Sequence, residues 1–202
     1  MGRMVLLCCL LGAASSAVAA ADHREPATVL VVYYSDKGHT KAMAEAVAKG
    51  AGGVEGAAVR LLSVSEATAD DVLAADAVIV GSPVYKANVA PPVQEFINSW
   101  PVKDERLHDK LGAAFATGSG VSAGEELVQL SILQSMLVCR MIVAGGPGAD
   151  QPFGASAVGE TPLPADGKED AVAAYYLKKG EALGKRIAEL SVRLKISKKD
   201  PA

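Results

Sequence analysis

Cysteine is scarce in this sequence, and so are aromatic residues. The 202 residues include three cysteines, and aromatic residues make up 4%. Cys8 and Cys9 lie within the first 21 residues, which leaves Cys139 as the only thiol in the rest of the chain and excludes a disulfide there. Because Cys139 has no partner nearby in the sequence, we expect a small buried residue rather than a catalytic thiolate.

An excess of positive charge and a long apolar run are also lacking. The formal net charge is −3, so the electrostatic term that drives nucleic-acid binding is missing. No apolar run reaches the ~20 residues that span a bilayer, which argues against stable membrane insertion. No set of histidines, cysteines and carboxylates has metal-ligand spacing. With 50% hydrophobic and 21% charged residues, the composition predicts one compact domain.

Residues 1–21 differ in character from the remainder. Arg3 is followed by an apolar segment at 5–14 and by small residues at 17–21, a pattern typical of a secretory signal peptide. An N-terminal strand or a membrane anchor stays open as an alternative. We therefore expect a signal peptide at 1–21, a folded domain at 22–202, and a periplasmic or secreted protein.

Beyond the leader, apolar β-rich runs alternate with helical patterns, which predicts βαβ units and a parallel sheet covered on both faces. The class is α/β. The segment 151–168 is rich in Gly, Pro and Ala and is expected to be one long loop. The expected strands are 28–34, 58–63, 77–81, 113–117 and 141–144, and the expected helices are 40–50, 93–100, 124–138 and 170–194.

The first strand leads directly into a short polar segment that precedes a helix. Free N–H groups and the positive dipole end of a helix N-terminus bind phosphate, so this segment is a candidate phosphate loop. Its spacing fits neither a triphosphate nor a dinucleotide motif, which favours a monophosphate. Simple helix capping by Ser35 or Thr40 is the alternative. His39 is expected to contact the ligand rather than to act as a base. The candidate residues are Ser35, Asp36, Lys37, Gly38, His39 and Thr40.

Two more loops follow the third and fourth expected strands, and the first and third strands flank the switch point of such a sheet. Tyr85 can stack on a planar ring, although a structural role for it stays open. The glycines of the later loop let the backbone approach a ligand. The candidates are Pro83, Val84, Tyr85, Lys86 and Asn88 in one loop, and Thr117, Gly118, Ser119, Gly120, Val121 and Ser122 in the other.

With these loops in view, the sequence resembles the flavodoxin-like family, and within it the tryptophan-repressor-binding-protein (WrbA) type of FMN-dependent NAD(P)H:quinone oxidoreductases. The resemblance covers about residues 29–190. It depends on four motifs: Tyr34-Ser35-x-x-Gly38-His39-Thr40, Gly81-Ser82-Pro83-Val84-Tyr85 with Asn88, Phe115-Ala116-Thr117-Gly118-Ser119, and Phe153-Gly154-Ala155-Ser156.

The resemblance implies a three-layer flavodoxin-like sandwich with a five-stranded parallel sheet of order 2-1-3-4-5. It also implies bound FMN, with the phosphate in residues 35–40, the isoalloxazine beside residues 84–86 and its pyrimidine edge on residues 117–122. The implied partners are NAD(P)H and a quinone or other small acceptor, in a homodimer or homotetramer.

Two alternatives stay open: an exported one-electron carrier with a protein partner, and a scaffold that has lost FMN. Two departures from the family pattern bear on quinone turnover. Val138-Cys139-Arg140 stands where the family tends to carry histidine before the fifth strand. Val84-Tyr85-Lys86-Ala87-Asn88 stands where it often has Thr-Arg-Phe-Gly-Asn.

Overall fold

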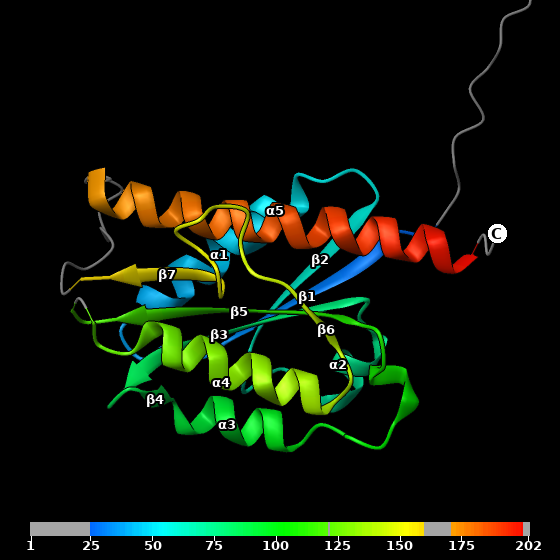
Figure 1. Cartoon of the computed structure of the whole chain (residues 1–202), viewed down its shortest axis with the longest axis horizontal. Coiled ribbons are helices and arrows are strands. Elements are labelled where there is room, and N and C mark those ends of the chain that lie inside the picture. The colour runs from blue at the N-terminus through cyan, green and yellow to red at the C-terminus, as the bar shows by residue number, and fades with distance from the viewer. Residues whose placement is uncertain (1–24, 121, 160–170, 200–202) are drawn as a thin grey trace, which may run out of the picture.

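The computed structural model describes residues 25–120, 122–159 and 171–199, so the expected signal peptide lies outside the described residues. A central sheet is sandwiched between two layers of helices (Figure 1). The strands are β1 Ala27–Tyr33, β2 Ala57–Ser63, β3 Ala77–Tyr85, β4 Asn88–Val89, β5 Leu111–Gly118, β6 Ile142–Val143 and β7 Ala155–Val158. The helices are α1 His39–Gly52, α2 Ala69–Ala74, α3 Pro91–Asn98, the 3₁₀ helix η1 Glu105–Leu107, α4 Glu125–Val138 and α5 Ala171–Lys199.

The α/β class with a parallel sheet is confirmed, but the expected five strands in the order 2-1-3-4-5 differ from the structure. Within the described residues the sheet has seven strands, and its main path runs β2-β1-β3-β5-β6. All pairs along this path are parallel, whereas β4 pairs antiparallel with β3. The strand numbers differ from those of the expected order because β3 continues beyond its expected end. The chain then turns back and forms the short hairpin strand β4.

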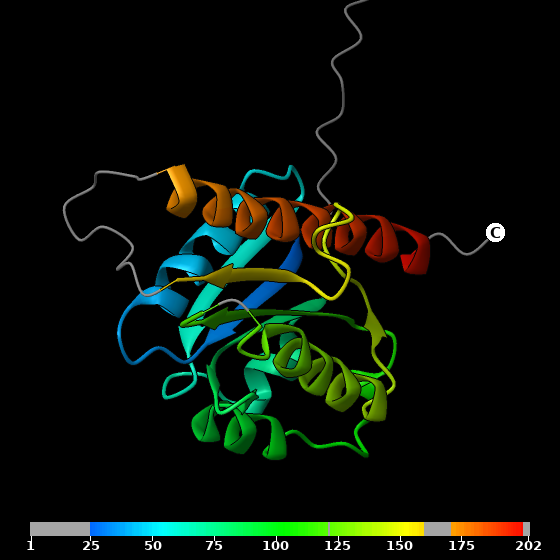
Figure 2. The same ribbon diagram turned by 60° about the vertical axis from the view of Figure 1, so that its left-hand side comes forward.

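The last strand of the sheet is divided in two. β6 pairs with the start of β5 at Leu111 and Gly112, and β7 pairs in parallel with the end of β5, from Phe115 to Gly118. Figure 2 shows β7 beside β5 and beneath α5. The prediction of one loop over 151–168 is therefore wrong for residues 155–158, whose run of small residues carries little β signal.

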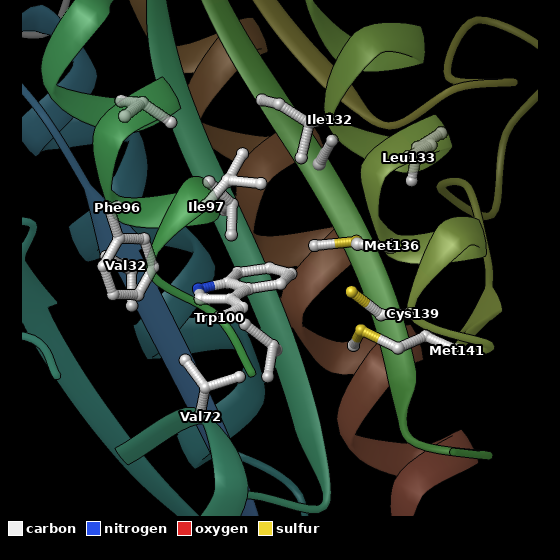
Figure 3. Packing of buried hydrophobic residues seen from close by; sticks show 14 of the residues in the cluster. Val32, Val72, Phe96, Ile97, Trp100, Ile132, Leu133, Met136, Cys139 and Met141 are labelled. Carbon is white, nitrogen blue, oxygen red and sulfur yellow. The ribbon is translucent and has the colours of Figure 1, made fainter. Parts of the chain in front are cut away.

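Alternate strand residues point to opposite faces of the sheet, and each face has its own core. Val29 and Val31 of β1 pack with α1 and α5, while Leu30 and Val32 pack with α2, α3 and α4. In the core on the side of α2, α3 and α4, the Trp100 ring lies near Ile97 and Met136 (Figure 3). It meets Phe96 edge-on at a centroid distance of 5.7 Å. A double-sided core of this kind requires strands that are apolar at nearly every position.

Helices α1 and α5 approach each other through their backbones. A Cβ atom added to Gly184 of α5 would lie 1.9 Å from the Val47 carbonyl oxygen, and one added to Gly50 of α1 would lie 1.9 Å from the Glu181 carbonyl oxygen. Glycine is therefore required at both positions. This close packing fixes α1, whose N-terminus follows the first loop, against the long terminal helix.

Among the described residues, no helix combines the length and the apolar character that a bilayer crossing requires.

Candidate functional site

The carboxyl ends of β1, β3 and β5 lie at one edge of the sheet, and the loops that follow them enclose a cavity of about 510 Å³. This volume falls within the roughly 300–1,000 Å³ that is usual for small-molecule sites. Segments that are far apart in the chain are thus brought together, as the parallel topology predicts. The lining residues are Ser35, Asp36, Lys37, His39, Thr40, Pro83, Val84, Tyr85, Thr117, Gly118, Ser119 and Gly159.

The first loop presents the uncapped N-terminus of α1 to this cavity. Gly38 is the N-cap residue, with φ of +90°, a conformation that glycine adopts without strain. No side chain caps the first turn of the helix. The Ser35 hydroxyl oxygen accepts a hydrogen bond from the Gly38 N–H at 3.0 Å, which leaves its own proton available to a ligand. Uncapped amides, a hydroxyl proton and a helix dipole are the features with which helix N-termini bind anions.

A buried hydrogen bond joins the first loop to the third. Thr40 and Thr117 are both buried, and their Oγ1 atoms lie 2.8 Å apart. Either hydroxyl can donate in this pair, and the acceptor keeps its own proton for a further contact. The pairing therefore fixes the spacing of two loops and still leaves one donor at the cavity.

The second loop is the hairpin between β3 and β4. Lys86 and Ala87 occupy its turn with φ of +51° and +61°, a left-handed conformation that asparagine or glycine usually adopts in such turns. Ser82 stabilises the base of the hairpin, because its buried Oγ accepts a hydrogen bond from the Ala90 N–H at 3.0 Å. A turn held in this conformation against its residue preference is a feature that recurs at functional sites.

Tyr85 stands at the cavity edge on this hairpin, and 39% of its surface is exposed. Its ring meets Tyr34 edge-on at a centroid distance of 6.4 Å. Hydrogen bonding to Tyr34 raises the pKa of Tyr85 above its usual value of 10.0, and desolvation raises it further. Tyr85 is therefore a neutral aromatic ring at physiological pH, held by a second ring, and it can lie against a planar ligand.

The third loop and β7 complete the cavity. The Gly159 N–H donates to the Gly118 carbonyl at 3.1 Å, which brings the end of β7 to the third loop. The sequence alone does not identify Gly159 as a site residue. Its only signal is that it follows β7, and the sequence does not predict that strand.

The motif Phe153-Gly154-Ala155-Ser156 positions β7 through contacts of its successive residues. A Cβ atom on Gly154 would lie 1.9 Å from the Ala114 carbonyl oxygen. Gln129 Nε2 donates to the Ala155 carbonyl at 2.7 Å, and Lys179 Nζ donates to Ser156 Oγ at 3.3 Å. The motif therefore holds β7 in place, and Gly159, which follows β7, lines the cavity.

Some candidates from the sequence lie elsewhere. Gly38 lines a neighbouring cavity of about 700 Å³, on the side of the first loop toward β2 and α3. Lys86 and Asn88 are exposed on the hairpin turn, where Asn88 Nδ2 donates to the Lys86 carbonyl at 2.8 Å. Gly120 and Ser122 are not among the lining residues, and Val121 lies outside the described residues.

Cys139 is buried, as expected, and burial raises the pKa of its thiol above 9.0. It closes α4 at the end opposite to Glu125, about 20 Å away along the helix at 1.5 Å per residue. The departure Val138-Cys139-Arg140 therefore lies far from the cavity of the same chain. In the part of the chain that the structure describes, no group of three His, Cys, Asp or Glu residues could hold a metal ion.

The residues present fit a ligand that carries a phosphate and a flat polar ring. The uncapped amides of α1 suit the phosphate, Tyr85 suits the ring face, and the glycine-containing third loop offers backbone groups to the ring edge. FMN combines these parts. The cavity thus agrees with the cofactor implied by the family resemblance.

Comparison with known proteins gives matches of three kinds. The family model described as NADPH-dependent FMN reductase matches residues 27–150. An NAD(P)H dehydrogenase (quinone) of Geotalea daltonii is 32% identical over 206 residues, covering 82% of this chain and 97% of that enzyme. A flavodoxin of Aquifex aeolicus is 38% identical over 122 residues, covering 58% of this chain and 64% of that flavodoxin. The crystal structure of a WrbA-like flavodoxin from Agrobacterium tumefaciens has a TM-score of 0.65 at 21% identity, covering 83% of this chain and 98% of that one, and shows the shared fold.

Proposed function

Because this chain belongs to the NADPH-dependent FMN reductase family of flavodoxin-like proteins, we propose that it is an FMN-dependent NAD(P)H:quinone oxidoreductase. The observation that carries this proposal is the meeting of three strand-end loops around one cavity beside the uncapped N-terminus of α1. The protein holds FMN there without a covalent bond.

We assign the three loops distinct roles in holding the cofactor. Residues 35–40 bind the phosphate through the amides of α1 and the hydroxyls of Ser35 and Thr40. Pro83, Val84 and Tyr85 border the isoalloxazine, with Tyr85 supplying the aromatic contact. Lys86 and Asn88 shape the hairpin turn that carries Tyr85. The third loop bonds the pyrimidine edge through Thr117, Gly118 and Ser119, which line the cavity.

When bound, FMN supplies the redox chemistry, since it accepts a hydride from NAD(P)H and passes electrons to the acceptor. The chain binds and orients the cofactor, and the mouth of the cavity admits the two substrates in turn. None of the polar lining residues has to move a proton, and we assign no catalytic acid or base.

A one-electron carrier that serves a protein partner is the rival function. It is not favoured, because relatives that align with 82–83% of this chain are NAD(P)H dehydrogenases (quinone). The two functions differ in a simple assay. An NAD(P)H dehydrogenase oxidises NAD(P)H at a steady rate with FMN and a soluble benzoquinone, whereas a carrier does not.

The decisive experiment combines a spectrum with that assay. We expect purified protein supplied with FMN to show a flavin absorbance band that remains after gel filtration. We also expect benzoquinone-dependent oxidation of NADH or NADPH that disappears when FMN is removed and returns when it is added back. A retained flavin without this oxidation would contradict the proposed activity, and no retained flavin would contradict the cofactor.

We further propose that residues 1–21 are a signal peptide, that 22–202 form the mature flavodoxin-like domain, and that the protein is periplasmic or secreted. The apolar run followed by small residues supports this. An intact mass of exported protein that retained Met1 would contradict it.

We also propose a homodimer or homotetramer. The outer face of α4 supports this, since Leu127, Leu137 and Val138 are exposed, as is Ile142 of the following strand β6. Sedimentation of the parent and of Val138→Lys tests it. We expect the parent to sediment as an oligomer and the variant to shift toward monomer.

A further inference from the structure

The carboxylate of Glu125 is buried at the start of α4, and one of its oxygens is unsatisfied. Only 2% of the residue is exposed. Oε2 accepts a hydrogen bond from the Gly124 N–H at 3.2 Å, whereas Oε1 has no hydrogen-bond partner among the residues that the structure describes. A buried carboxylate oxygen without a donor costs free energy, so such a group calls for an explanation.

The unsatisfied oxygen lies directly behind the proposed flavin cavity. A Cβ atom added to Gly118 would lie 1.9 Å from Glu125 Oε1, so the oxygen lies against the backbone of Gly118. Gly118 itself lines the cavity. The backbone of Gly118 therefore contacts both the buried carboxylate and the cavity, and this approach is possible only because residue 118 is glycine.

The Glu125 carboxylate lies at the positive dipole end of α4. Glu125 is in the first turn of α4, where the helix dipole stabilises a negative charge. Burial keeps water and salt from screening that charge, so it acts on its surroundings more strongly than a surface carboxylate does. Glu126, the next residue, is in the same helical turn and is exposed.

We propose that Glu125 sets the reduction potential of the bound flavin and lowers it. This inference depends on the proposed function. Hydride transfer oxidises NAD(P)H to NAD(P)⁺ and leaves one additional negative charge on the flavin. The Glu125 carboxylate repels that charge across Gly118, so it disfavours the reduced state relative to the oxidised state. The reduced cofactor then passes its two electrons to a quinone more readily.

Three proteins test this: the parent, Glu125→Gln and the matched control Glu126→Gln. Each is loaded with FMN and titrated spectroelectrochemically at one fixed pH, in low and in high salt. We expect Glu125→Gln to raise the ratio of reduced to oxidised flavin about tenfold at a given potential, which is a shift of about 30 mV for a two-electron couple. The shift persists in high salt, and Glu126→Gln leaves the potential unchanged.

Binding measurements separate this effect from a purely structural one. Because the charge acts on the reduced state, the dissociation constant for oxidised FMN should stay within about threefold of the parent in Glu125→Gln. A Glu125→Gln protein that folds and binds FMN with the potential of the parent would overturn the proposal. The same shift in both variants would also overturn it, as would loss of the fold in both Glu125→Gln and Glu125→Ala. Failure of the proposed function is distinguishable, because the parent itself would then retain no flavin or oxidise no NAD(P)H.

Discussion

The hydroxyl oxygens of Thr40 and Thr117 lie 2.8 Å apart in a buried pair, although 77 positions separate the two residues in the chain. Thr40 is in the first turn of α1 and Thr117 is near the end of β5. The pair therefore links the proposed phosphate loop to the loop proposed for the pyrimidine edge. It also gives the cavity a defined width before any ligand enters.

Removing this hydrogen bond should lower the free energy of unfolding of the FMN-free protein. Thr117→Val keeps the shape of the side chain but leaves the buried Thr40 hydroxyl without its partner, which costs roughly 1–3 kcal/mol of the free energy of unfolding. Urea denaturation of the FMN-free protein measures this. Thr117→Ser is the control, since it keeps the hydroxyl. Equal stability of the valine and serine variants would show that the hydrogen bond contributes nothing.

The end of α4 contains a residue in an unfavourable backbone conformation. Arg140 has φ of +60°, the Arg140 N–H donates to the Leu137 carbonyl, and the Met141 N–H donates to the Met136 carbonyl. These two bonds form a Schellman motif, in which glycine is the preferred residue at the position of Arg140. We expect Arg140→Gly to be about 1 kcal/mol more stable than Arg140→Ala in urea denaturation. An alanine variant as stable as the glycine variant would refute this.

Lys110 binds the C-terminal end of α2. Its buried ammonium donates to the carbonyls of Leu73 and Ala75. Lys110→Met keeps much of the volume but leaves those carbonyls without this donor, so we expect a loss of roughly 2–3 kcal/mol in the free energy of unfolding. Because Lys110 precedes β5, at the edge opposite to the cavity, FMN affinity should not change. A parallel loss of affinity would contradict the assigned position of the site.

Asp104 should contribute to loss of stability in acid. Hydrogen bonds from Arg106 lower its pKa in the folded protein from 3.8 to about 2. A pKa lowered by folding adds stability that is present above pH 3.8 and is lost as the pH falls toward 2. Asp104→Asn should therefore show a smaller drop in stability between pH 5 and pH 2.5 than the parent does. Identical pH profiles from chemical denaturation would contradict this contribution.

Much of this architecture can be predicted from the sequence, because parallel strands that are buried on both faces are apolar at nearly every position. The expected strand at 28–34 corresponds to β1, Ala27–Tyr33, and the expected helix at 124–138 corresponds to α4, Glu125–Val138. A continuous run of apolar residues predicts β1, and leucine at helical spacing predicts α4. The loops then follow from the topology, because parallel strands end at the same edge.

The features that escaped prediction depend on tertiary contacts. β7 consists of Ala155–Val158, whose small residues favour no strand by themselves, and Gln129 and β5 hold it in place. The hairpin turn places Lys86 and Ala87 at positive φ, where local preference favours asparagine or glycine. Glu125 looks in the sequence like an ordinary acidic residue at a helix start. Only the fold shows that its carboxylate lies behind Gly118.

The central claim is that the loop of residues 35–40 binds the phosphate of FMN. Fluorescence titration of the parent and of the double variant Ser35→Ala with Thr40→Ala, using FMN and riboflavin in parallel, tests it most directly. The variant lacks two hydroxyl donors to a charged group, each contributing roughly 1.5–3 kcal/mol, and keeps the backbone amides. We expect its FMN affinity to fall by about ten- to a hundredfold, while its affinity for riboflavin, which has no phosphate, changes little. Unchanged FMN affinity, or an equal loss for riboflavin, would contradict the claim.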